Sequence, residues 1–159
     1  MKTEFPTKSK VYEEQIRLVA EKIKQIGKNK IAYIILFGSF ARGNWVDDIR
    51  VENDGTVTTY NSDYDFLILT RKHVDGSGAK GRNFERDISK KLNKGDPRTT
   101  RTVTIIVESL NKVNNDLKKG QYFFSDIKKE GILLYRAETV KDLADAKKLL
   151  AHLNLIAFT

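Results

Sequence analysis

Cysteine is missing from the 159-residue sequence, and histidine occurs only twice, at His73 and His152. The lack of cysteine excludes disulfide bonds, thiolate zinc sites and cysteine nucleophiles, and it suits a reducing cytoplasm. The two histidines lie far apart and have no partner at a spacing typical of metal ligands. The carboxylates are therefore the candidate metal ligands.

Long apolar segments are also missing. No run approaches the roughly 18 apolar residues of a membrane-spanning helix, and the first ten residues, MKTEFPTKSK, contain no apolar core of a signal peptide. With only two prolines, 40% hydrophobic residues and 31% charged residues, the composition is typical of a folded domain. We expect one soluble, cytoplasmic domain without membrane contact.

Positive charge is in excess, because 29 lysines and arginines stand against 21 acidic residues and give a net charge of +8. This excess permits attraction to a polyanion such as nucleic acid, or to a nucleotide. The lysines are spread along the predicted helices, however, and no aromatic residues alternate with them as they do in single-strand-binding grooves. Solvated helix faces and a nucleic-acid groove both stay open as explanations.

Apolar periodicity, glycines and turn residues predict an alternation of helices and strands. The first predicted elements are an amphipathic helix over residues 9–26, a buried strand over 31–37, a hairpin over 50–60 with its turn at Asp54–Gly55, and a strand over 63–70. There follow a flexible loop around Gly76, Gly78 and Gly81, a helix over 82–94, a strand over 102–108, a helix from Leu110 to Gly120, a helix over 121–131, a strand over 132–136, and a last helix capped by Thr139 and Asp142. This order predicts an α+β (α/β) fold with a mixed β-sheet flanked by helices and a β-hairpin insertion.

Gly38 and Ser39 directly follow the buried strand, in the segment GSFARG, residues 38–43. A glycine at such a turn lets the backbone approach a phosphate, and the amide groups of a helix that begins there favour an anion. Ser39 adds a hydroxyl donor, and Arg42 faces either the same ligand or a surface carboxylate. A strand-to-helix turn also needs glycine for steric reasons alone, so a phosphate site and a purely structural turn are both open.

Asp63 and Asp65 lie at the start of the predicted strand 63–70. Side chains at i and i+2 of a strand point to one face, so the two carboxylates are expected side by side. They repel each other unless a cation lies between them or one is protonated, and Mg²⁺ suits such oxygen ligands together with substrate phosphates. A solvent-facing strand start is the alternative for this pair alone, and the preceding glycine turn favours the metal.

The segments GSFARG and SDYDFLIL resemble the Gly-Ser and Asp-x-Asp signature of the DNA polymerase beta-like nucleotidyltransferase superfamily, especially its minimal nucleotidyltransferases. A longer insertion, residues 44–61, separates the two parts. This insertion and residues 120–135 are similar to a subgroup whose nucleotidyltransferase domain precedes a helical HEPN domain. The resemblance implies a nucleotidyltransferase domain over residues 1–136, and a C-terminal helix over residues 137–159 that packs on it or extends from it, because 23 residues are too few for a HEPN bundle.

Position by position, the resemblance implies that Gly38 and Ser39 hold a nucleoside triphosphate and that Asp63 and Asp65 ligate Mg²⁺. Arg42 is counted with the nucleotide-binding residues because it lies three residues after Ser39. Both aspartates are counted as catalytic residues as well as metal ligands.

The family often has a third carboxylate on a later strand, and Thr104 stands at the corresponding place. Glu108 shares the strand face of Thr104 but lies four residues away, roughly 13 Å along a strand. Glu108 is kept as the candidate third catalytic residue, with an exposed strand-end role as the alternative. The departure at Thr104 concerns catalysis more than nucleotide binding.

Several other side chains have a structural and a functional interpretation. Trp45 lies between Gly43-Asn44 and acidic residues, so we expect it outside the core, where it covers a bound base. Tyr122, Phe123 and Ile127 have helical spacing and are expected in the core. The acidic pair 47–48 is expected on a charged hairpin rim, with an approach to the metal from the insertion as the alternative.

Three functions follow from these observations. The first is an enzyme that transfers a nucleoside monophosphate from a triphosphate to an unidentified acceptor, which is a protein, a small molecule or RNA. The second is a catalytically weak or inactive nucleotide-binding, antitoxin-like module that partners a separate HEPN-domain protein, as a missing third carboxylate favours. The third is a basic RNA-binding domain.

Overall fold

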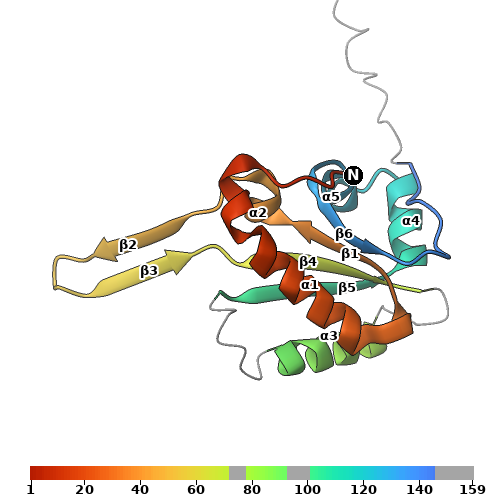
Figure 1. The fold of residues 1–159 in the computed structure, drawn as a ribbon, viewed down its shortest axis with the longest axis horizontal. Helices are drawn as coiled ribbons and strands as arrows, with labels where there is room; N and C mark the ends of the chain where they lie inside the picture. Colours follow the sequence, from red (N-terminus) through yellow and green to blue (C-terminus); the bar gives the residue numbers. More distant parts are fainter. Residues whose placement is uncertain (72–77, 93–100, 146–159) are drawn as a thin grey trace, which may run out of the picture.

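The computed structural model describes residues 1–71, 78–92 and 101–145, and its centre is a four-stranded mixed sheet (Figure 1). The strands are β1 (Ile31–Phe37), β4 (Tyr64–Thr70), β5 (Val103–Ser109) and β6 (Ile132–Arg136), in the order β5-β4-β1-β6. β4 is antiparallel to β1 and parallel to β5, and β6 is antiparallel to β1. The predicted α+β fold with a mixed sheet is confirmed.

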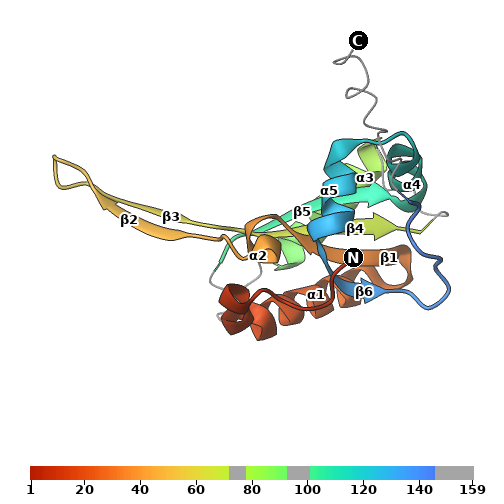
Figure 2. The ribbon, with the colours of Figure 1, turned by 90° about the horizontal axis from the view of Figure 1, so that it is seen from above.

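Helices cover both faces of this sheet. They are α1 (Glu13–Gly27) and α3 (Gly78–Leu92) on one face, and α4 (Leu110–Lys118) and α5 (Tyr122–Glu130) on the other, with the short helices η1 (Thr7–Tyr12), η2 (Lys28–Lys30) and α2 (Gly38–Arg42) at the connections. Ile34 and Leu36 of β1 pack with α1 and α3, whereas Tyr33 and Ile35 pack with α4 and α5. Figure 2 shows α1 and α5 on opposite sides of the sheet. Burial on both faces explains the continuous apolar run of β1.

The predicted elements agree with the structure except in two places. α3 begins at Gly78 and contains the buried Gly81. The loop predicted around these two glycines is therefore wrong, because a glycine is tolerated in a closely packed helix. Gly76 lies outside the described residues. No helix begins between Thr139 and residue 145, and the Thr139 hydroxyl, which was expected to cap one, accepts a hydrogen bond from Arg71 Nη1 at 2.8 Å.

The remaining parts of two predicted helices, residues 93–94 and 146–159, lie outside the described residues. The division of the chain after residue 136 therefore stays a prediction. Among the helices that the structure describes, none is both long and apolar enough to cross a membrane.

β2 (Asp47–Val51) and β3 (Val57–Asn61) form a separate two-stranded sheet, called the ribbon below. Every residue of both strands is exposed, and Gly55 in the connecting turn has a φ of +83°. Figures 1 and 2 show the ribbon projecting from the end of the sheet where β4 begins. The predicted hairpin insertion is confirmed.

Arg101 fastens the base of the ribbon to the rest of the protein. Its guanidinium donates hydrogen bonds to both carboxylate oxygens of Asp47, at 2.6 and 2.9 Å, and to the backbone oxygen of Ser62 at 2.9 Å. The same group lies 4.9 to 5.8 Å from the centroids of four aromatic rings, those of Tyr12, Phe40, Tyr64 and Trp45. Only 10% of the Arg101 side chain is exposed, so water screens these contacts weakly. The hydrogen bonds from Arg101 hold the pKa of Asp47 below its ordinary value.

Arg101→Lys is expected to lower the free energy of unfolding by about 1–3 kcal/mol, because lysine keeps the charge but loses the bidentate hydrogen bonds and the planar ring contacts. Urea denaturation measures this change. Arg50→Lys is the matched control, since Arg50 pairs with Asp48 on the exposed ribbon, and its effect is expected to stay within about 0.5 kcal/mol. Equal effects of the two substitutions would contradict the anchoring role of Arg101.

Candidate functional site

The turn between β1 and α2 brings the backbone against a carboxylate. Gly38 has a φ of +73°, and a Cβ atom at this position would overlap Oδ2 of Asp65. Both the backbone conformation and the close approach disfavour any residue with a side chain here. Gly43 ends the helix with a φ of +78°, and its N–H donates a hydrogen bond to the backbone oxygen of Ser39 at 2.8 Å. The turn therefore holds Ser39 close to the start of β4.

Strand pairing places the two aspartates beside Thr104. Phe37, the last residue of β1, pairs with Asp65 of β4, and Asp65 pairs with Thr104 of β5. Asp63 directly precedes β4, and its Oδ2 accepts a hydrogen bond from Thr104 Oγ1 at 3.3 Å. Thr104 thus lies next to the carboxylate pair, at the place where the resemblance implies a third carboxylate.

These residues meet in one cavity of about 330 Å³ at the base of the ribbon. Its lining consists of Gly38, Ser39, Arg42, Tyr60, Asn61, Ser62, Asp63 and Asp65. The expected meeting of the glycine-serine turn with the aspartate pair is confirmed. Residues 60–62 were not among the predicted site residues, although their position directly before Asp63 was a signal that the returning strand of the hairpin ends at the site.

Asp65 carries its charge in an unfavourable environment. Burial, and next the negative charge of Asp63, raise the pKa of Asp65 from 3.8 to about 6, while Arg42 lowers it to a smaller extent. Near neutral pH Asp65 therefore carries its charge close to Asp63, and a cation between the two side chains would relieve the repulsion.

A divalent cation with a preference for oxygen ligands fits this pair. Asp63 and Asp65 both face the cavity, and Mg²⁺ is commonly bound by one or two carboxylates together with water and substrate phosphates. In the part of the chain that the structure describes, no group of three or more histidine, aspartate and glutamate side chains could hold a metal ion. The remaining ligands of a metal here would thus come from water or from a bound phosphate.

Arg42 and Glu108 differ in how they relate to the cavity. Arg42 lines it, although its exposed guanidinium also lies 3.8 Å from the carboxylate of Glu130. Glu108 pairs in register with Leu69, four residues beyond Asp65, and its carboxylate contacts Lys112 Nζ at 3.3 Å. The structure does not bring Glu108 to the cavity.

Two aromatic predictions are corrected. Trp45 packs against the core, because its ring stacks on Phe40 at 5.3 Å between centroids and meets Tyr12 edge-on, so it is not free to cover a base as expected. In α5, Phe124 takes the buried place expected for Phe123 and Tyr122, which are exposed because the helix turns that face outward. Ile127 is buried, as predicted.

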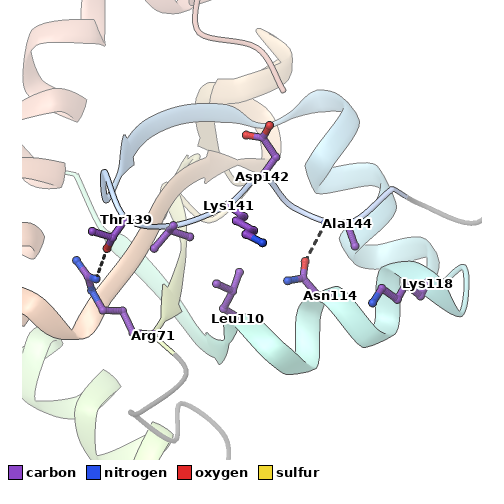
Figure 3. A pocket seen from close by; sticks show the side chains of 9 residues that line it. Arg71, Leu110, Asn114, Lys118, Thr139, Lys141, Asp142 and Ala144 are labelled. Carbon is purple, nitrogen blue, oxygen red and sulfur yellow. Dashed lines mark hydrogen bonds between the residues drawn. The ribbon is translucent and has the colours of Figure 1, made fainter.

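A larger cavity of about 610 Å³ lies at the opposite end of β4 (Figure 3). Residues of α4 and of the segment 139–144 form its walls, where Asn114 accepts a hydrogen bond from the backbone of Ala144. Of the residues that line it, the one carboxylate, Asp142, is paired with Arg136. This cavity offers no carboxylate pair, so the chemistry expected from the sequence belongs to the smaller one.

Comparison with known protein families finds no match, and no curated protein sequence matches the chain. The fold is similar to the crystal structure, at 1.40 Å resolution, of a protein from Sulfolobus solfataricus provisionally identified as a nucleotidyltransferase. The two chains are 16% identical, with 87% of this chain and 96% of the other covered and a TM-score of 0.47. A likeness at this level carries no argument about function. The function is inferred below from the geometry of the site alone.

Asp65→Asn is expected to stabilise the metal-free protein above pH 6 by up to about 2 kcal/mol, because it removes a carboxylate whose pKa rises from 3.8 to about 6 on folding. Between these pH values the folded protein binds more protons than the unfolded chain, so wild-type stability falls as the pH rises. The advantage of Asn should therefore vanish near pH 4. Urea denaturation in EDTA at several pH values measures it, with the exposed Asp87→Asn as control, and a pH-independent difference would contradict the charge repulsion.

Proposed function

We propose that this protein is a nucleotidyltransferase, which uses Mg²⁺ to transfer a nucleoside monophosphate from a nucleoside triphosphate such as ATP to an acceptor. The observation that carries this proposal is the meeting of Gly38 and Ser39 with Asp63 and Asp65 in one cavity. A turn whose backbone permits close approach suits phosphate groups, and a carboxylate pair suits the metal ion that accompanies them. Each part is ambiguous alone, whereas their combination suits a metal-bound triphosphate.

In this reaction the oxygen of an acceptor hydroxyl forms a bond to the α-phosphorus. The bond from that phosphorus to the bridging oxygen breaks, and pyrophosphate leaves with the electron pair. The Ser39 hydroxyl donates a hydrogen bond to a phosphate oxygen, and Arg42 supplies positive charge at the rim of the cavity. Asp63 and Asp65 would hold Mg²⁺, which would neutralise charge on the phosphates when bound.

Among the side chains that the structure describes next to the aspartates, none is a further carboxylate or histidine that could take up the proton of the acceptor hydroxyl. Thr104 occupies the nearest position on β5, and a hydroxyl cannot take up a proton at neutral pH as a carboxylate does. We therefore expect slow transfer, or an acceptor that brings its own base. The acceptor is a protein, a small molecule or RNA.

The position of Thr104 also supports a second candidate function. A protein that binds a triphosphate through the glycine turn and the aspartates, without efficient transfer, would act as a nucleotide-dependent regulatory partner of a HEPN-domain protein. Measured turnover with each triphosphate separates this candidate from the enzyme.

The double variant Asp63→Asn/Asp65→Asn is expected to abolish the Mg²⁺ dependence of ATP binding. Without the metal ion the two carboxylates repel the phosphates, and without the carboxylates the metal ion loses its protein ligands. Calorimetry with ATP in Mg²⁺ and in EDTA measures both states. Asp48→Asn, on the ribbon, is expected to keep the wild-type dependence. Unchanged Mg²⁺-dependent affinity in the double variant would rule out this site.

Thr104→Asp is expected to raise turnover or to strengthen the binding of a second metal ion, because it restores a proton acceptor beside Asp63. General-base assistance contributes about 10²- to 10⁴-fold in rate. Pyrophosphate release and the mass of candidate acceptors measure transfer, and Thr58→Asp, which adds the same charge to the exposed ribbon, is the matched control. If the wild type turns over quickly and Glu108→Gln silences it while ATP binding persists, Glu108 is the base and our interpretation of Thr104 is wrong.

A further inference from the structure

The ribbon has an apolar face that nothing in the described part of the chain covers. Ile49, Val51 and Val57 share this face with Thr59, whereas Thr58 points to the other face. The three apolar residues are 69%, 71% and 59% exposed. A two-stranded ribbon is at best marginally stable alone in water, so an apolar face on it favours contact with a second surface.

Charge distinguishes the ribbon from the rest of the protein. Residues 47–61 contain four acidic residues and one basic residue and therefore have a net charge of −3. Because the whole chain has a net charge of +8, the residues outside the ribbon have a net charge of +11. Two of the acids, Glu52 and Asp54, form an acidic tip next to Val51 and Val57. Nucleic acids and anionic lipid surfaces would repel this ribbon, whereas a basic protein surface attracts it.

A surface with the opposite character lies between α4 and α5, in residues Lys118–Phe123, called the α4–α5 corner. Tyr122 is 71% exposed and Phe123 is 48% exposed, and both rings follow the exposed pair Lys118 and Lys119. The corner thus presents aromatic rings beside positive charge, as the ribbon presents apolar side chains beside an acidic tip. Aromatic side chains of this kind are enriched in the centres of protein interfaces.

We infer that the ribbon docks on the α4–α5 corner of a second copy of this chain, and that the contact is reciprocal and forms a two-fold dimer. In both views the ribbon points away from α4 and α5 of its own chain (Figures 1 and 2), so the two surfaces do not meet within one molecule. Reciprocal docking buries two ribbons and two corners in one dimer. The buried surface area therefore comes closer to the roughly 800 Å² per partner of a standard interface than a single docked ribbon would.

The first test compares two substitutions at neighbouring positions on opposite faces of the ribbon. Sedimentation velocity of the full chain over a range of concentrations measures the dimer dissociation constant. Val57→Lys places a charge on the docking face and should raise this constant at least about tenfold, whereas Thr58→Lys adds the same charge to the other face and should change it less than about twofold. Raising the salt to about 1 M should also weaken the dimer.

The second test separates docking from any general loss of structure. Tyr122→Glu damages the corner and leaves the ribbon intact, and Val57→Lys does the reverse. In an equimolar mixture the ribbon of the Tyr122→Glu copy can dock on the corner of the Val57→Lys copy, so the mixture should form heterodimers more tightly than either variant forms homodimers. Far-UV circular dichroism and thermal midpoints confirm that each variant is folded.

Three results would overturn the inference. They are a wild-type protein that is monomeric up to submillimolar concentration, equal weakening by Val57→Lys and Thr58→Lys, and a mixture of variants that associates no better than its components. If the wild type bound RNA or anionic vesicles and Val57→Lys lost this binding, the partner of the ribbon would be that ligand and not a second copy of the chain, which would also overturn the inference.

Discussion

The antiparallel register between β1 and β4 determines where every part of the candidate site lies. Because Phe37 pairs with Asp65, the glycine turn after β1 and the acidic start of β4 meet at one end of the sheet. A slip by one residue would turn Asp65 towards α1 and α3 and carry the buried Tyr64 to the other face. The apolar clusters on the two faces therefore fix the register, and the register fixes the site.

Asp65 shows how the core and the site are connected energetically. The same packing that buries β4 removes water from its carboxylate, and the glycine backbone approaches that carboxylate more closely than any side chain would allow. The site is consequently less stable without a counter-ion than the strands around it, and the rest of the fold offsets this cost. Such local conflict between stability and charge is typical of functional sites.

Local patterns predicted the elements that depend on local chemistry. The apolar run of β1, the Asp54–Gly55 turn and the i, i+2 spacing of Asp63 and Asp65 each express a rule that acts within a few residues. The role of Arg101 could not be predicted in this way, because its carboxylate and its four aromatic partners come from distant parts of the chain. Trp45 was misplaced for the same reason, since its neighbours in sequence are polar and its neighbours in space are not.

The ribbon and the cavity share residues. Tyr60 and Asn61 end β3 and also line the cavity. Ser62, whose backbone oxygen accepts a hydrogen bond from Arg101, separates them from Asp63. A partner that tilts the ribbon and a ligand that displaces Asp63 would therefore act on the same short segment, residues 60–63. Because linkage between binding sites is reciprocal, any effect of such a partner on ligand affinity would equal the effect of the ligand on the affinity for the partner.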